Sequence, residues 1–146
     1  MNIPYRVDTC VPHEPPMLLV EELLERHKTG DDDDRAKVGA TVPLDGPFIA
    51  NGRVLPEYYI ELAAQAMAAV DGYDARQEAK TTGEGFLVGV DDFRIFSLVK
   101  PGTYLVVSLV KEFAFSGVQI FNATVFKETT RVGKGQIRIW QDKTGA

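Results

Sequence analysis

The middle of the chain carries one long, uninterrupted helical pattern. From Tyr58 to Tyr73 there is no proline, and the one glycine, Gly72, lies near the end. Apolar side chains cover nearly the whole circumference of this segment, which is typical of a helix buried on all sides. Pro56 and Glu57 suit its first turn, because a helix start does not need the proline N–H and its positive dipole end favours an acid. We therefore expect a central helix that other elements wrap.

The segments on either side of this helix have the composition of β-strands. They are rich in branched and aromatic residues and are separated by short turns that contain glycine or proline. The predicted strands are residues 17–24, 36–44, 86–95, 104–115, 118–127 and 135–140. Strands before and after a single buried helix predict an α+β fold, an antiparallel sheet with its helix on one face.

Composition adds limits to this picture. With 146 residues, 45% hydrophobic and 25% charged, we expect one globular domain over residues 1–146. The net charge of −5 provides no broad positive field, so nucleic acid is not an expected partner. Residues 1–12 are broken by prolines and charges, so they predict neither a signal peptide nor a membrane span.

The cysteine count points to a reducing compartment. Cys10 is the one cysteine, so no internal disulfide can form, and the cytoplasm is the expected location. We expect Cys10 to be a small buried hydrophobe rather than a nucleophile. The chain also lacks a zinc ligand set, a phosphate loop and a nucleophile elbow, so no metal or cofactor is expected.

Two charged or titratable groups of residues have plain structural explanations. The four aspartates 31–34 repel one another, and we expect them in a solvated surface loop without a function. His27 lies among charged residues next to a turn, so a surface position is expected. His13 lies in a proline-rich segment, where it either satisfies local backbone groups or belongs to a site.

The helix itself carries the first candidate site. Glu57, Glu61 and Gln65 recur every four residues and therefore share one stripe of the helix. The stripe is either a solvated helix edge or a polar site. If a sheet wraps the helix, a buried Glu61 carboxylate costs free energy unless it is paired or used in chemistry.

Three segments, in this order, resemble a known enzyme family. Residues 12–21 read Pro-His-Glu-Pro-Pro-Met-Leu-Leu-Val-Glu, residues 61–65 read Glu-Leu-Ala-Ala-Gln, and residues 89–94 read Gly-Val-Asp-Asp-Phe-Arg, with Pro-Gly at 101–102. Together they resemble the 3-hydroxyacyl-acyl-carrier-protein dehydratases of fatty acid synthesis. The resemblance implies the hotdog fold, in which a sheet wraps a long helix, and dimers that pair their sheets edge to edge and form two tunnels at the interface.

The resemblance also assigns roles and shows one departure. In the family, a histidine in a Gly-His-Phe-Pro-Gly loop before the helix acts with an acid on the helix of the partner subunit. Glu61 matches the acid, whereas residues 47–56, which match the loop, contain no histidine. A divergent branch found with aryl-polyene biosynthesis genes also lacks this histidine, and the chain resembles that branch more closely.

The function implied is dehydration of a 3-hydroxyacyl thioester in fatty acid or polyene biosynthesis. Glu61 and His13 are the expected catalytic residues, and Gln65, Asn51 and Arg53 the expected substrate contacts. The alternatives are an acyl thioesterase, whose helix carboxylate activates water, and a non-catalytic hotdog partner of an active dehydratase.

Expected partners follow from the same resemblance. They are acyl carrier protein or acyl-CoA, and a second subunit in a homodimer, a higher oligomer or a heterodimer with a homologue. An acidic carrier would need a local basic surface, for which Lys127, Arg131, Lys134 and Arg138 are candidates. The alternative is that these four are solvated charges that discourage strand pairing at a sheet edge.

Overall fold

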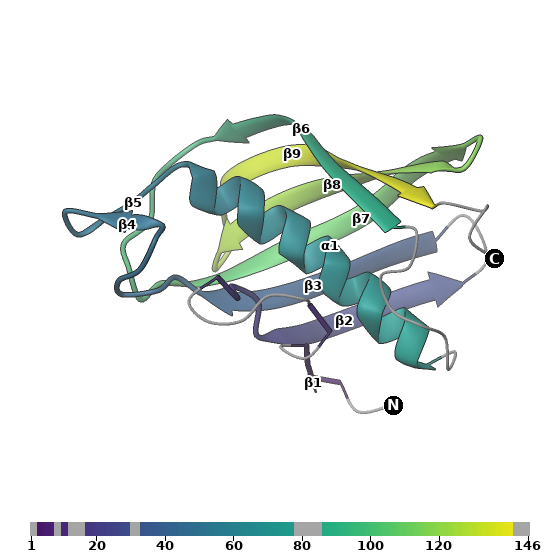
Figure 1. Cartoon of the computed structure of the whole chain (residues 1–146), viewed down its shortest axis with the longest axis horizontal. Helices are drawn as coiled ribbons and strands as arrows, with labels where there is room; N and C mark the ends of the chain where they lie inside the picture. The colour runs from purple at the N-terminus through teal and green to yellow at the C-terminus, as the bar shows by residue number, and fades with distance from the viewer. Residues whose placement is uncertain (1–2, 8–9, 12–16, 30–32, 78–85, 142–146) are drawn as a thin grey trace.

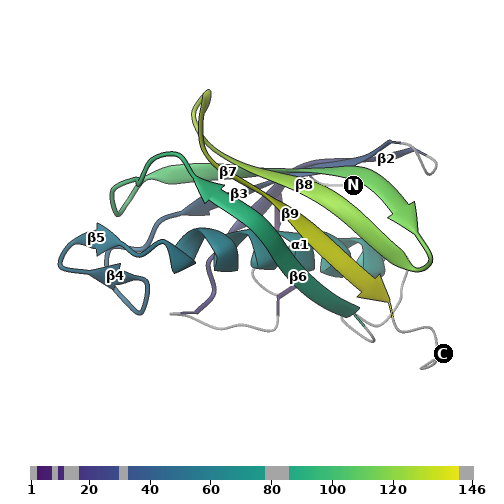
Figure 2. The same cartoon turned by 90° about the horizontal axis from the view of Figure 1, so that it is seen from above.

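The computed structural model describes residues 3–7, 10–11, 17–29, 33–77 and 86–141, and the account below concerns these residues. Helix α1 spans Glu57–Gln77 and lies diagonally across one face of a sheet (Figures 1 and 2). The strands are β1 (Tyr5–Arg6), β2 (Glu22–Thr29), β3 (Asp33–Thr41), β4 (Ile49–Ala50), β5 (Arg53–Val54), β6 (Phe86–Ile95), β7 (Tyr104–Phe115), β8 (Val118–Lys127) and β9 (Thr130–Gln141).

The large sheet has seven strands in the order β1-β2-β3-β7-β8-β9-β6, and all its pairings are antiparallel. Strands β4 and β5 form a separate hairpin that leads into α1. The predicted α+β arrangement, one helix against an antiparallel sheet, is confirmed. In the described part of the chain, no helix is long and apolar enough to span a membrane.

The helix is confirmed and is longer than the pattern predicted, but it is not buried on all sides: Ile60 is 44% exposed, and Ala64 and Ala68 are only partly buried. Eleven of its residues are buried, and they include Tyr58, Leu62, Ala66 and Tyr73. The helix continues past Gly72 to Gln77. At Gly72 the N-terminal segment crosses the helix so closely that a Cβ there would lie 2.7 Å from the carbonyl oxygen of Cys10. Cys10 is buried at this crossing, as expected.

The strand predicted at residues 17–24 corresponds to β2, which starts later than predicted. It begins at Glu22 rather than at residue 17, and it runs to Thr29. Met17 and Leu19 are not part of the strand because their backbone groups are bonded to the helix residue Gln65 instead. The strand after it begins at Asp33 and ends at Thr41, and the last strand begins at Thr130 rather than at residue 135.

The expectation of a solvated aspartate loop is wrong for Asp34. This residue lies within β3 and is 4% exposed. Its carboxylate accepts a hydrogen bond from Arg26 Nη1 at 2.6 Å and lies 3.7 Å from Lys111 Nζ, which stabilises the charge in a buried position. The run of four aspartates did not indicate that Asp34 is buried, because the cations that compensate its charge, Arg26 and Lys111, come from β2 and β7. Residues 31 and 32 lie outside the described residues.

Candidate active site

The polar stripe of α1 passes from solvent into the interior. Glu57 is exposed, Glu61 is half-buried and Gln65 is 1% exposed. The residues are spaced by one helical turn each, so their side chains follow one another along one side of the helix. The stripe is therefore a solvated edge at its start only, and Glu61 stands at the boundary between water and the interior.

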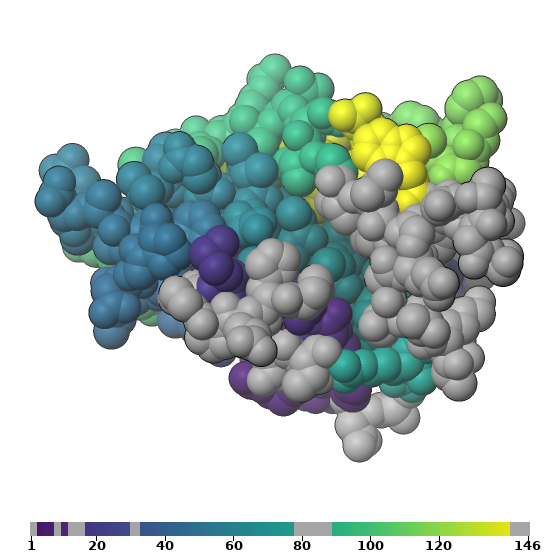
Figure 3. Space-filling model, in the orientation of Figure 1, coloured from purple at the N-terminus to yellow at the C-terminus, as the bar shows by residue number. Residues whose placement is uncertain are grey.

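Gln65 is bonded to the N-terminal segment. Its Oε1 accepts a hydrogen bond from Leu19 N at 2.7 Å, and its Nε2 donates one to Met17 O at 2.6 Å. Both groups of the buried amide thus have backbone partners, and residues 17–19 are held against the helix. Figure 3 shows purple residues of the N-terminal segment on the face where the teal helix lies. The expectation that Gln65 contacts substrate stays a prediction, and the geometry assigns the side chain a positioning role.

Of the two histidines, the structure describes His27 but not His13. His27 is exposed on β2, and its Nε2 lies 3.6 Å from Glu25 Oε1, so its expected surface position is confirmed. His13 lies outside the described residues, and its assignment as a catalytic residue stays a prediction.

Tyr58 is a polar residue of the helix that the sequence pattern did not single out. It precedes Glu61 by three residues and Gln65 by seven, so it belongs to the same side of α1. The side chain is fully buried, and its hydroxyl has no hydrogen-bond partner within the part of the chain that the structure describes. Burial raises the pKa of the Tyr58 phenol far above its ordinary value, so the group stays protonated.

The loop before the helix is a tight β-hairpin. Asn51 and Gly52 form its turn with φ angles of 54° and 72°, the left-handed conformation that a two-residue hairpin turn requires. The hairpin protrudes at the end where α1 begins (Figures 1 and 3). Asn51 and Arg53 are exposed on it, and their expected contact with substrate stays a prediction.

The motif at residues 89–94 forms part of β6 and packs closely on β9. A bulge lies between Asp91 and Arg94, and Asp92 has a φ of 51°. Phe93 sits over Gly135, where a Cβ would approach its ring to 2.5 Å. The two glycines of β9 at 133 and 135 are therefore required by the aromatic side chain that the bulge turns toward them.

Of the four basic residues considered for docking, Arg138 already contacts Asp91 and Trp140 within the chain. It donates a hydrogen bond to Asp91 Oδ1 at 2.9 Å, and its guanidinium lies 4.9 Å from the ring centroid of Trp140. Lys127, Arg131 and Lys134 are exposed. Within the described residues, no group of three His, Cys, Asp or Glu side chains is placed to hold a metal ion.

Comparison with known proteins decides the family. A family model described as "ApeP-like: ApeP dehydratase" matches residues 5–146. The chain belongs to the ApeP-like dehydratase family. Curated relatives of this ApeP-like chain include the 3-hydroxyacyl-[acyl-carrier-protein] dehydratases FabZ of Burkholderia mallei (strain SAVP1) and Burkholderia thailandensis. Both are 29% identical to it over 126 residues, which cover 82% of the chain and 77% and 75% of the relatives.

Solved structures agree on the fold. The ApeI:P dehydratase heterocomplex from Xenorhabdus doucetiae matches with a TM-score of 0.76 and 24% identity, covering 96% of this chain and 93% of that one. The virulence protein Cj0977 from Campylobacter jejuni matches with a TM-score of 0.65 and 14% identity over 94% and 88% of the two chains. The ApeP-like chain has the hotdog fold that its sequence led us to expect.

Proposed function

We propose that this ApeP-like chain dehydrates 3-hydroxyacyl thioesters in fatty acid or polyene biosynthesis, with Glu61 as the acid-base residue. The observation that carries the proposal is the position of Glu61. It is half-buried on a helix wrapped by the sheet, one turn before a fully buried glutamine. A carboxylate at the edge of the interior can exchange protons with a ligand while water is partly excluded.

The reaction assigned to Glu61 moves one proton. The carboxylate removes a proton from the α-carbon of the thioester, and the electron pair of the C–H bond forms the new double bond. The C–O bond to the 3-hydroxyl breaks, and the protonated Glu61 returns its proton to that oxygen, which leaves as water. Hydrogen-bond donors near the thioester oxygen lower the barrier, because negative charge develops there in the transition state.

The other candidate residues are proposed to position the substrate relative to Glu61. Gln65 holds residues 17–19 against the helix, and His13 stands four residues before Met17 in the sequence. We propose that His13 orients the 3-hydroxyl and that Gln65 acts by holding this segment. Asn51 and Arg53, on the exposed hairpin, are free to contact the substrate or a second subunit.

We also propose that the chain works in an oligomer and that a homologue is its most effective partner. Its helix offers the acid of the family, while residues 47–56 offer no loop histidine. A homologous hotdog subunit with that histidine would complete a site around Glu61. The ApeI:P heterocomplex, a dehydratase of two different chains, supports this arrangement. The thioester would be carried by acyl carrier protein or coenzyme A, in the cytoplasm.

The test is an assay of the purified chain with 3-hydroxyacyl thioester, alone and with a homologous dehydratase subunit. We expect the Glu61→Gln variant to lose activity by about 100-fold or more, the usual contribution of a general acid-base group. Glu57→Gln is the matched control, because Glu57 is exposed one turn earlier on the same helix. Full activity of Glu61→Gln would overturn the assignment, and release of free thiol without an alkene would indicate a thioesterase.

A further inference from the structure

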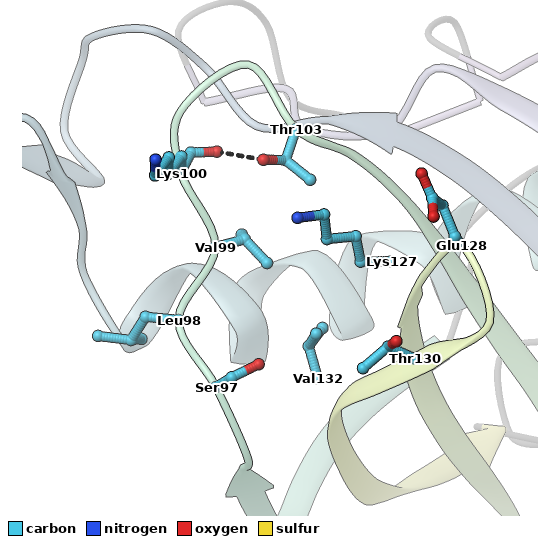
Figure 4. A pocket seen from close by; sticks show the side chains of 9 residues that line it. All are labelled: Ser97, Leu98, Val99, Lys100, Thr103, Lys127, Glu128, Thr130 and Val132. Atoms are coloured by element: carbon cyan, nitrogen blue, oxygen red, sulfur yellow. Dashed lines mark hydrogen bonds between the residues drawn. The ribbon is translucent and has the colours of Figure 1, made fainter.

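The first turn of α1 carries two adjacent buried tyrosines whose hydroxyl groups have different surroundings. The Tyr59 hydroxyl donates to Ser97 O and accepts from Val99 N, both at 3.1 Å. It thereby holds the loop after β6, which lines a hollow beside the start of the helix (Figure 4). The Tyr58 hydroxyl, by contrast, has no hydrogen-bond partner among the residues that the structure describes.

Packing accounts for the ring of Tyr58 but not for its hydroxyl. The ring centroid lies 6.0 Å from that of Phe48 and 5.8 Å from that of Tyr59, both in edge-on geometry. A phenylalanine would keep these contacts and avoid the free-energy cost of burying a hydroxyl group without a partner. A partner from outside the described residues, such as a bound ligand, would account for the hydroxyl.

Tyr58 lies on the side of α1 that carries the candidate acid-base residue. It precedes Glu61 by three residues, which places the two side chains about 60° apart around the helix and next to each other on its surface. Glu61 is half-buried, whereas Tyr58 lies in the interior. Burial, and in smaller part the Tyr59 hydroxyl and the Glu21 carboxylate, raise the pKa of the Tyr58 phenol. The phenol therefore keeps its proton and can donate it in a hydrogen bond.

The backbone at the start of α1 offers few hydrogen-bond donors to a ligand. A helix usually presents four free N–H groups in its first turn, and such groups commonly stabilise negative charge. Here Pro56 has no N–H group, and the N–H groups of Tyr58 and Tyr59 donate to Leu55 O and Pro56 O at 3.0 and 3.2 Å. Negative charge that develops on a ligand beside Glu61 is therefore best stabilised by a side-chain donor.

We propose that the Tyr58 hydroxyl donates a hydrogen bond to the carbonyl oxygen of the bound thioester. The proposal rests on the proposed function, because dehydration creates negative charge on that oxygen. When Glu61 removes the α-proton, the C–H electron pair forms a C=C bond to the carbonyl carbon, and the carbonyl π pair moves to oxygen. Re-formation of the carbonyl shifts the C=C bond to the α- and β-carbons and expels the 3-hydroxyl, which takes the proton from Glu61 and leaves as water. Tyr58 keeps its own proton and stabilises the charged oxygen.

Phe48 is the neighbour of Tyr58 that can admit a ligand. It is half-buried and lies just before the β4–β5 hairpin, which is separate from the large sheet (Figure 1). Rotation of the Phe48 side chain breaks no strand pairing of the large sheet. Access to the Tyr58 hydroxyl therefore requires little rearrangement of the fold, and the thioester enters beside the hairpin.

The first measurement is turnover of 3-hydroxyacyl thioesters by the full chain, alone and with a homologous dehydratase subunit. We expect Tyr58→Phe to lower kcat by about 100-fold with KM nearly unchanged, as for the loss of one donor to a charged oxygen. Tyr104→Phe is the matched control: Tyr104 is 43% exposed on β7 and its hydroxyl donates to Glu22, so its loss should leave kcat unchanged. Wild-type kcat in Tyr58→Phe would overturn the proposal. If Tyr58→Phe does not fold, Tyr58→Leu takes its place.

A second measurement detects the hydrogen bond without turnover. The probe is trans-2-butenoyl-coenzyme A labelled with ¹³C at the carbonyl, and its infrared spectrum is recorded bound to Glu61→Gln, in which it stays unreacted. We expect the carbonyl band at a lower frequency than in solution, because a hydrogen bond to the oxygen weakens the C=O bond. The shift should disappear when Tyr58→Phe is added to Glu61→Gln. A band that the second substitution leaves in place would contradict the contact.

The two measurements distinguish failure of this proposal from failure of the proposed function. Loss of turnover in Glu61→Gln together with full turnover in Tyr58→Phe refutes the Tyr58 assignment alone. A carbonyl shift that depends on Tyr58, in a chain that does not dehydrate the thioester, refutes the dehydratase assignment alone. Absence of both turnover and the shift refutes both.

Discussion

The guanidinium of Arg26 on β2 contacts both carboxylate oxygens of Asp74 on α1, with Nε–Oδ1 and Nη2–Oδ2 distances of 2.9 and 2.6 Å. The same guanidinium donates to Asp34 at 2.6 Å, and the side chains of Arg26 and Asp34 are 8% and 4% exposed. The last turns of the central helix are thereby tied to β2 and β3 through one cation.

Removing this cation should destabilise the chain strongly. We expect Arg26→Gln to lower the free energy of unfolding by about 3 kcal/mol, because Asp34 and Asp74 lose their hydrogen-bonded partner in a poorly solvated position. They keep only the more distant amino groups of Lys111 and Lys28, at 3.7 and 3.8 Å. Arg35→Gln is the control: Arg35 pairs with Asp33 at 3.0 Å with both side chains half exposed, and its loss should cost less than about 1 kcal/mol. Chemical denaturation of both variants measures the difference, and equal values would contradict the structural role of Arg26.

Gln65 provides a second test, located in the candidate site. Gln65→Leu leaves the amide of Leu19 and the carbonyl of Met17 without their partners, so we expect a loss of about 2 to 4 kcal/mol. Hydrogen exchange of the Leu19 amide should accelerate more than that of strand amides. Unchanged exchange at Leu19 in Gln65→Leu would contradict this role.

Substitution of Tyr58 is expected to stabilise the chain, in contrast to the variants above. Its buried hydroxyl has no partner among the described residues, so Tyr58→Phe should raise the free energy of unfolding by about 1 kcal/mol. Tyr59→Phe is the matched control, because it removes two hydrogen bonds to residues 97 and 99 and should destabilise the chain. Thermal unfolding of the two variants distinguishes them. A destabilised Tyr58→Phe would mean that the hydroxyl has a partner in the native protein.

Gly135 tests the packing of the bulge in β6. A methyl group at residue 135 would lie 2.5 Å from Phe93 Cδ2 and 3.1 Å from its Cα, so the backbone as well as the ring must move. We expect Gly135→Ala to cost about 2 kcal/mol through overpacking. Phe93→Leu should recover part of this loss in the double variant, because the two residues are in direct contact. Additive losses in a double-mutant cycle would argue against this contact.

Several features could be predicted from local sequence. The proline-free apolar run at 58–73 indicated a buried helix, and branched and aromatic runs indicated the strands around it. The ordered motifs at 12–21, 61–65 and 89–94 indicated the dehydratase family, which the match over residues 5–146 confirms. These inferences succeed because helical and strand periodicity, and short motifs, are properties of residues close together in the chain.

Other features were decided by the tertiary structure. Gln65 bonds to Leu19 across 46 residues, which keeps residues 17–19 out of β2. Asp34 is buried because Arg26 and Lys111 reach it from neighbouring strands. Lys127 meets the loop at 97–103 only because the sheet places β8 and β9 beside β6 and β7. Local periodicity sets which residues face inward, but it does not set which distant segments become neighbours. That choice follows from strand order and from the pairing of buried polar groups, and both depend on the whole chain.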